Sequence, residues 1–204
     1  MLIIGIAGGS GSGKTTVVNK ITELLPPRAV SILSQDAYYF DNGHLTPEER
    51  ARINFDHPSS IEFSLLTQHL DLLLQGENIP MPIYSYLTCA RAKETVTIVP
   101  KKVIIVEGIL IFTDTELRKR LDVKVFVDAA PDDRLMRIIQ RDMIERGRSL
   151  QQALSHYGSF VKPMHEQFIE PTKRYADIIV PQGGENHVAI SILTAQIRSK
   201  LGLG

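Results

Sequence analysis

Short runs of Ile, Val and Leu recur along the chain, and segments with helical spacing of apolar residues lie between them. The runs occupy residues 2–7, 29–34, 101–108, 122–129 and 176–181. Their apolar residues are consecutive instead of alternating, which is typical of strands that are buried on both faces of a parallel sheet. The pattern therefore predicts an α/β fold of the doubly wound type, with a parallel sheet flanked by helices.

The spacing of apolar residues predicts helices over about 13–25, 61–75, 131–145, 149–168 and 187–201. One stripe on the second of these helices is assigned to the core and consists of Leu65, Leu66, His69, Leu70, Leu73 and Leu74. Residues 76–98 interrupt the alternation of strands and helices, because IPMPIYSYL and ETVTIV have the character of short strands. We expect a small β-hairpin there, inserted in the sheet.

Length and composition narrow the class of protein. The 204 residues fit one domain, 1–204, and the 43% of apolar residues supply a sizeable core. Lys+Arg and Asp+Glu balance at 23 each, so the charge indicates neither nucleic acid nor an anionic membrane as a partner. The single cysteine, Cys89, allows no intrachain disulfide, and no apolar run has transmembrane length. Because the start also lacks the basic region of a signal peptide, we expect a cytoplasmic enzyme.

The stretch GGSGSGKTT matches the phosphate-loop pattern G-x-x-x-x-G-K-[ST] and lies between a predicted strand and a predicted helix. Its glycines let backbone N–H groups turn toward an anion, and the helix presents its positive end. Lys14 is placed to reach the β- and γ-phosphates, and the Thr15 hydroxyl is placed to bind Mg²⁺. We expect a nucleoside triphosphate to contact Gly8, Gly9, Ser10, Gly11, Ser12, Gly13, Lys14, Thr15 and Thr16.

Two acids follow predicted strands, at the edge where open α/β sheets bind ligands. Glu107 ends VIIVE, where a carboxylate is placed to hold the magnesium ion or its water; otherwise it is a solvated strand end. Asp36, in SQDAYYF, either accepts a proton from an attacking hydroxyl or caps a turn.

Three further residues are candidates for contacts to a small acceptor. Asp56, in NFDHP, either accepts hydrogen bonds from the paired hydroxyls of a ribose or caps a helix. Tyr84 and Tyr86 lie on one face of an extended segment, where they form either a stacking platform for a base or a patch of core.

The segment RLMRIIQRDMIERGR, residues 134–148, is rich in arginine. Arg146 and Arg148 flank Gly147 beside a predicted helix end, and few acids accompany them. The segment is either a solvated basic face or a lid, over about 141–150, that brings positive charge over a transferring phosphoryl group.

Together these motifs resemble the uridine–cytidine kinase family, in the phosphoribulokinase and uridine kinase group of P-loop kinases. The resemblance extends from GGSGSGKTT to YADIIVP and includes SQDAYY, NFDHP, PIYSYLTCAR, VEGIL, RDMIERGR and KPMHEQFIEPTKRYADIIVP. It implies transfer of the γ-phosphate of ATP or GTP to the 5′-hydroxyl of uridine or cytidine, with Mg²⁺, in pyrimidine salvage. It also implies a homo-oligomer, because family members are commonly homotetramers.

The same resemblance implies a role for each candidate residue. Asp36 is the general base, and Lys14 serves the transferred phosphate. Asp56 holds the ribose hydroxyls, with Tyr39 nearby. Tyr84 contacts the pyrimidine, which Phe55 and Tyr86 sandwich. Thr15 and Glu107 bind the magnesium ion, and the phosphates are contacted by Arg141, Arg146 and Arg148.

Three positions depart from the family's pattern. Cys89 replaces a histidine that hydrogen-bonds the base, Ile138 replaces an arginine that binds the ribose, and His156 replaces a glutamine that faces the sugar. Each lost hydrogen bond costs roughly 1–3 kcal/mol of recognition, so several losses would relax or redirect the specificity. Alternatively, Cys89 and Ile138 fill core and His156 is a solvated helix residue.

The sequence is also compatible with two other functions. One is a kinase of the same group that acts on a different nucleoside or small hydroxyl acceptor, such as a sugar phosphate. The other is a regulatory switch driven by a nucleoside triphosphate. Asp36 and the aromatic residues argue against the switch, and the sequence contains no guanine-reading NKxD motif.

Overall fold

Five strands form one sheet, in the order β2-β5-β1-β6-β7, in the computed structural model of the chain, which describes residues 1–50 and 52–203. The strands are β1 (Leu2–Ala7), β2 (Val30–Ser34), β5 (Val103–Glu107), β6 (Val123–Val127) and β7 (Ile178–Val180). Every pairing among them is parallel, as the consecutive apolar runs predict. Residues 51 and 204, which the expected domain of 1–204 includes, lie outside the described residues.

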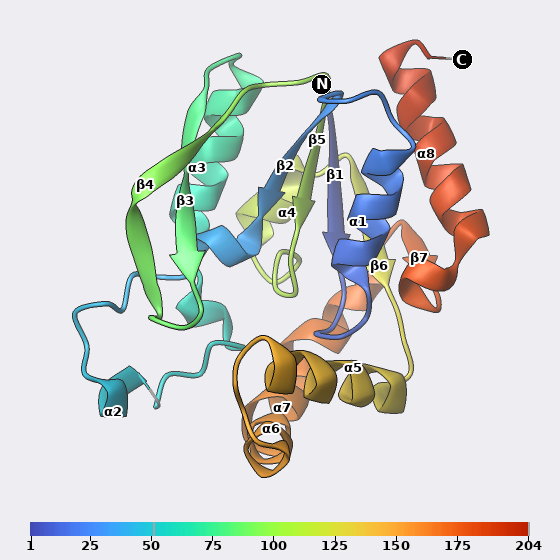
Figure 1. Ribbon diagram of the computed structural model, residues 1–204. Helices are drawn as coiled ribbons and strands as arrows, with labels where there is room; N and C mark the ends of the chain where they lie inside the picture. The colour runs from blue at the N-terminus through green and yellow to red at the C-terminus, as the bar shows by residue number, and fades with distance from the viewer. Residues whose placement is uncertain (51, 204) are drawn as a thin grey trace.

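Helices cover both faces of this sheet (Figure 1). On one face, α1 (Lys14–Glu23) and α8 (His187–Leu201) pack over β1 and its neighbours around Ile6 and Val17. On the other face, α3 (Phe63–Leu74) and α4 (Thr115–Arg120) pack around Leu66 and Phe112. The predicted α/β fold with a parallel sheet flanked by helices is therefore confirmed. Among the described residues, no helix combines the length and the apolar character that crossing a bilayer demands.

The expected hairpin forms, but it is not inserted in the main sheet. Strands β3 (Ile79–Ser85) and β4 (Ala90–Ile98) pair with each other as a separate antiparallel sheet. Ile79 is fully buried, whereas most of β4 is exposed to solvent. With one face to bury, the hairpin packs that face onto the α3 side of the core instead of extending the two-sided parallel sheet.

The remaining helices gather at the carboxyl ends of the strands, with α5 (Pro131–Ile144), α6 (Leu150–His156) and α7 (Lys162–Met164) beneath the sheet in Figure 1. The helix expected over 149–168 is a longer helical run that contains π-helical stretches at Tyr157–Val161 and His165–Ile169. Short helices fall at α2 (Pro47–Arg50), Gln35–Tyr38, Pro58–Ser60, Glu170–Tyr175 and Gly183–Glu185.

Candidate active site

Three chain segments leave the carboxyl edge of the sheet side by side, because β2, β5 and β1 are neighbours. Ser34 of β2 is in register with Glu107 of β5, which is in register with Ile6 of β1. Asp36 follows β2, and the phosphate loop follows β1. Since neighbouring strands lie about 4.8 Å apart, Asp36 and the phosphate loop start roughly 10 Å from each other, with Glu107 between them.

The phosphate loop has a backbone that glycine alone adopts readily. Gly11 and Gly13 have φ values of 75° and 90°, and a Cβ on Gly13 would lie 3.2 Å from the backbone N of Gly184. Helix α1 begins directly after it, at Lys14. The buried Lys14 ammonium donates to the Gly9 carbonyl at 3.4 Å. Burial lowers the pKa of Lys14, although the carboxylates of Glu107 and Asp36 oppose this effect.

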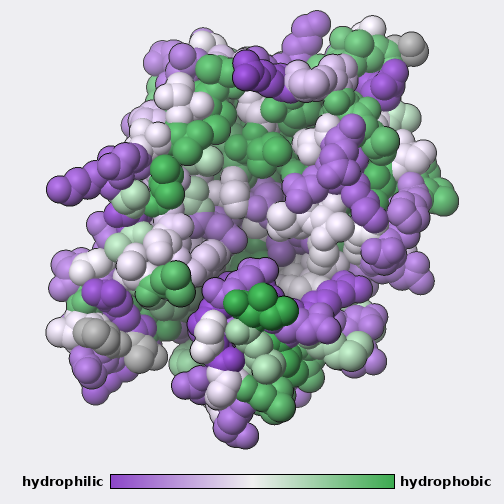
Figure 2. Space-filling model, in the orientation of Figure 1, coloured by the Kyte–Doolittle hydropathy of each residue, from purple (hydrophilic) through white to green (hydrophobic). Residues whose placement is uncertain are grey.

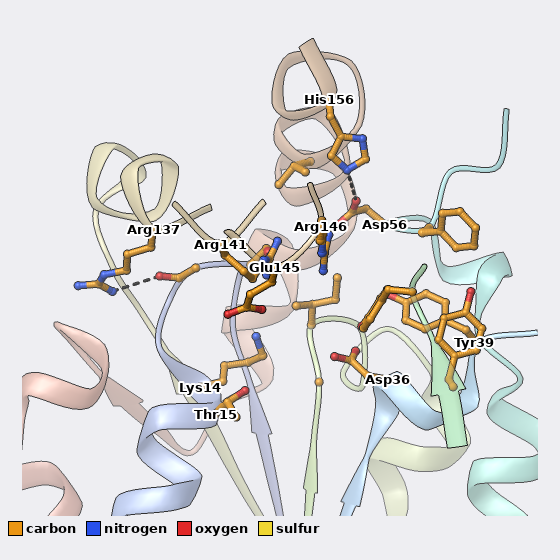
Figure 3. A pocket seen from close by; sticks show the side chains of 18 of the residues that line it. Lys14, Thr15, Asp36, Tyr39, Asp56, Arg137, Arg141, Glu145, Arg146 and His156 are labelled. Carbon is orange, nitrogen blue, oxygen red and sulfur yellow. Dashed lines mark hydrogen bonds and ion pairs between the residues drawn. The ribbon is translucent and has the colours of Figure 1, made fainter. Parts of the chain in front are cut away.

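Three arginines of α5 donate to the same loop, and Figure 3 labels two of them, Arg137 and Arg141. Arg134 and Arg137 donate to the carbonyls of Ser10 and Gly11, at 3.4 and 3.1 Å. Arg141 donates to the Ser10 hydroxyl at 3.2 Å. The three arginines are spaced three and four residues apart, which places them on one face of the helix. Of these, only Arg141 was expected at the phosphates; the other two hold the loop itself.

Glu107 and Thr15 line one cavity, where they are suited to a magnesium ion. The Ser34 hydroxyl donates to Glu107 at 2.5 Å. Burial raises the pKa of Glu107, the Lys14 ammonium opposes this, and Asp36 adds to it. The described residues contain no group of three or more His, Cys, Asp or Glu side chains arranged to hold a metal. A magnesium ion bound to nucleotide phosphates needs only one or two oxygen ligands from the protein, so these two residues fit it.

Four aromatic rings form the other end of this cavity, and we call them the aromatic wall: Tyr39, Phe55, Tyr84 and Tyr86. The buried Tyr39 ring touches the other three, with centroid distances of 5.9 Å to Phe55, 5.2 Å to Tyr84 and 5.8 Å to Tyr86. The rings come from segments far apart in sequence, including the hairpin. The structure thus brings these predicted residues together beside Asp36.

Asp56 and His156 face each other beside the aromatic wall, with 4.0 Å between Oδ2 and Nε2. Burial raises the pKa of Asp56, although Arg146 and Arg141 oppose this. Burial also lowers the pKa of His156 to about 4, with Arg148 adding to the effect. Cys89 lines the same cavity. Ile138, in contrast, is fully buried within α5, so it fills core as the simpler interpretation predicts.

The arginines of the expected lid lie over the middle of the cavity. Arg141, Arg146 and Arg148 line it, and the Arg146 guanidinium lies 4.7 Å from the centroid of the Tyr86 ring. Glu145 also lines it and was not foreseen. The only signal for Glu145 is its place two residues before Gly147.

The cavity encloses about 630 Å³ and joins the phosphate loop to the aromatic wall. Figure 2 shows the hollow between the main body and the helices below it, and Figure 3 shows Lys14 and Asp36 projecting into it from neighbouring segments. One end offers backbone N–H groups and cations for phosphates, and the other offers rings and an acid for a polar ring compound. Asp36 lies between the two ends, where an acceptor hydroxyl would meet a γ-phosphate.

Known proteins match the chain over nearly its whole length. A sequence model of the phosphoribulokinase / uridine kinase family matches residues 3–189. The uridine kinase of Limosilactobacillus reuteri is 51% identical over 98% of this chain and 92% of its own length. That of Clostridium novyi is 49% identical over 98% of this chain and 96% of its own.

Solved structures of lower identity share the fold. One is described as a putative fructose transport system kinase from Silicibacter, with a TM-score of 0.68 and 20% identity over 88% of this chain and 89% of its own. Another, described as a possible uridine kinase from Bacillus stearothermophilus, has a TM-score of 0.56 and 22% identity over 88% of both chains.

Proposed function

Since the chain belongs to the phosphoribulokinase / uridine kinase family, we propose that it transfers the γ-phosphate of ATP to the 5′-hydroxyl of uridine or cytidine, forming UMP or CMP in pyrimidine salvage. The observation that carries the proposal is the position of Asp36. It lies between the phosphate loop and the aromatic wall in one cavity. A general base in that position takes the proton of a hydroxyl as the hydroxyl attacks the phosphorus atom.

The end of the cavity at the phosphate loop, the donor end, binds the triphosphate. In this proposal, the N–H groups of the loop and the α1 N-terminus bind the β- and γ-phosphates, and Lys14 moves from the Gly9 carbonyl onto them. Arg141, Arg146 and Arg148 balance the charge that is spread over the transferring group. The hydrogen bonds from Arg134 and Arg137 to the loop carbonyls hold the loop in the conformation that binds phosphates.

A magnesium ion would be held by Thr15 and Glu107 together with the phosphates, and when bound it neutralises charge on the β- and γ-oxygens. The hydrogen bond from Ser34 orients the Glu107 carboxylate toward that task.

The acceptor end supplies recognition of the nucleoside. The rings of the aromatic wall offer stacking surfaces for the pyrimidine, with Tyr84 in contact with it. The Asp56 carboxylate accepts hydrogen bonds from the paired ribose hydroxyls, and His156 is placed to join it.

Cys89 and His156 favour one alternative, a different nucleoside as the preferred acceptor. A thiol is a weak hydrogen-bond donor, so Cys89 forms a weaker hydrogen bond to the edge of a base than an imidazole would. GTP is the alternative phosphate donor, because the phosphate loop binds the phosphates, which ATP and GTP share, and does not contact the base.

Nucleoside-dependent release of ADP tests the proposal. The purified protein is incubated with ATP and Mg²⁺ and with each of a set of nucleosides, and ADP is measured with time. We expect fast release with uridine or cytidine and slow release without a nucleoside. Release that no nucleoside accelerates would contradict the proposal, and a strong preference for another nucleoside would favour the alternative acceptor.

We also infer that the enzyme works in the cytoplasm as a homotetramer. The exposed apolar side chains of the hairpin, among them Ile83 and Val96, support self-association, because such side chains favour contacts between chains. Sedimentation velocity distinguishes a tetramer from a monomer directly.

A further inference from the structure

A buried carboxylate lies at the centre of the arginine-rich segment. Asp142, in the last turns of α5, has no exposed surface. Its side chain accepts hydrogen bonds from Arg141, at 3.1 Å, and from Arg148, at 2.5 Å. Arg146 lies 3.5 Å from the same carboxylate. The backbone N–H of Arg148 donates to the Asp142 carbonyl, which closes the turn around Gly147.

The electrostatics keep this carboxylate ionised. Burial alone would raise the pKa of Asp142, but Arg146, Arg141 and Arg148 outweigh it and hold the pKa below its ordinary value. A buried charge is costly unless it is paired, and here it has three partners. In turn, three guanidinium groups gathered without an acid among them would repel one another.

The partners of Asp142 are the arginines that face the cavity. Arg141 also donates to Ser10 in the phosphate loop, and Arg146 also lies against the Tyr86 ring of the aromatic wall. The set therefore touches both ends of the cavity. A guanidinium group has five N–H donors, and a bond to Asp142 leaves others free to meet a phosphoryl group.

We propose that Asp142 is a positioning residue for phosphoryl transfer: it holds Arg141, Arg146 and Arg148 as one set over the cavity, between the phosphate loop and the aromatic wall. The proposal rests on the proposed function, since it assigns these arginines to the transferring phosphate. Asp142 itself is buried and touches no substrate, so it acts only through the arginines.

The variant Asp142→Asn tests the proposal, because it keeps the shape of the side chain and removes its charge. We expect kcat to fall about tenfold to a hundredfold, because cationic donors to a transition-state oxyanion lose their alignment. The KM for uridine is expected to stay within about twofold. The matched control is Asp132→Asn, which removes an exposed acid from the first turn of the same helix and is expected to leave kcat unchanged.

A purely structural role predicts a different result. It would lower the melting temperature of Asp142→Asn but leave kcat at the wild-type value, well below the melting temperature, and that outcome would overturn the proposal. If Asp142→Asn does not fold, Asp142→Glu replaces it. This variant keeps the charge but displaces the guanidinium groups by a methylene, so we expect kcat to fall several-fold. A folded Asp142→Glu enzyme with wild-type kcat would equally overturn the proposal.

Two further measurements separate this inference from the proposed function. Calorimetric titration with ATP, without any nucleoside, is expected to show binding by Asp142→Asn that is several-fold weaker than the wild type. If the wild type binds ATP but phosphorylates no nucleoside, the proposed function fails, and weaker binding by the variant still supports the role of Asp142. In that case, equal ATP binding by the two proteins contradicts the role of Asp142; where a nucleoside is phosphorylated, equal kcat alone contradicts it.

A double-mutant comparison tests whether Asp142 acts through the arginines. Adding Asp142→Asn to Arg146→Gln is expected to lower kcat by less than Asp142→Asn lowers it in the wild type, since residues in one network are not additive. Fully additive losses would contradict action through Arg146.

Discussion

The imidazole of His156 and the carboxylate of Asp56 face each other across the acceptor end of the cavity, 4.0 Å apart, although a hundred positions separate them in the chain. His156 comes from α6, and Asp56 comes from the loop that precedes Pro58–Ser60. Because burial and the nearby arginines hold the pKa of His156 to about 4, its imidazole is neutral at pH 7 and keeps one N–H to donate. The pair thus combines an acceptor and a donor at the place proposed for the ribose.

Removing the charge of Asp56 is expected to weaken nucleoside binding and leave ATP binding intact. For Asp56→Asn we expect the KM for uridine to rise about tenfold to a hundredfold, since a hydrogen bond to a charged group contributes about 1.5–3 kcal/mol. Steady-state kinetics with uridine and with 2′-deoxyuridine measure this. The variant should lose less with the deoxynucleoside, and an equal loss with both substrates counts against a contact to the paired hydroxyls.

A histidine at position 89 is expected to improve recognition of uridine. Cys89 has a backbone φ of 51°, in a region where histidine is found more often than most residues. For Cys89→His we expect kcat/KM for uridine to rise about tenfold, if one new hydrogen bond contributes about 1–1.5 kcal/mol. Cys89→Ser is the control for the loss of the thiol. If Cys89→His brings no improvement, position 89 does not limit recognition.

Placing the family's arginine at position 138, by Ile138→Arg, is expected to destabilise the protein. Ile138 is fully buried, so a longer, charged arginine side chain there would have to displace the packing around it. Its expected effect is a loss of stability and not a gain in ribose binding.

Asp36→Asn keeps the size of the side chain and removes the proton acceptor. Loss of a general base lowers kcat by about 10²–10⁴-fold, whereas the KM for uridine should change little. Rapid-quench measurement of a single turnover isolates the chemical step. A normal kcat together with weaker nucleoside binding would instead make Asp36 a substrate contact.

The stability of the fold is expected to fall as the pH falls from about 6.5 to about 4. His165 lies behind the phosphate loop, where burial and the Arg134 guanidinium lower its pKa to about 4. Its unfolded value is near 6.5, so between these values the unfolded chain binds more protons. The contribution is therefore complete above pH 6.5 and is lost toward pH 4, on the order of 1–3 kcal/mol.

Urea unfolding at a series of pH values measures this loss. His165→Asn removes the titrating group, so the free energy of unfolding should fall less steeply with pH in the variant than in the wild type. Identical slopes for the two proteins would rule out His165 as a source of the pH dependence.

The sequence predicted the donor end of the site most completely, because local rules determine it. The phosphate loop needs only its glycines, Lys14 and the strand and helix on either side of it. Glu107 and Asp36 followed from one further rule, that the carboxyl ends of parallel strands meet at one edge. Neighbouring strands in the order β2-β5-β1 then bring all three segments together.

Features that depend on packing between distant segments were beyond the sequence. The hairpin resembles a strand pair of the main sheet, and only the packing of Ile79 against the α3 side shows that it is separate. Asp142 appears in the sequence as one acid in a basic run, and its burial among three arginines depends on how the chain turns at Gly147. Arg134 belongs to the arginine-rich segment that the sequence shows, but its contact with the phosphate loop is a tertiary one.

The position of the phosphate in the product tests the central claim most directly. Uridine, ATP and Mg²⁺ are incubated with the wild-type protein, and phosphorus–proton NMR identifies the carbon that carries the new phosphate ester. Lys14→Ala is the control, since it removes the cation placed for the β- and γ-phosphates and should yield no product. The proposed function predicts a monoester at the 5′ position, formed only by the wild type. A phosphate at another position, or ADP formed at the same rate with and without uridine, would contradict it.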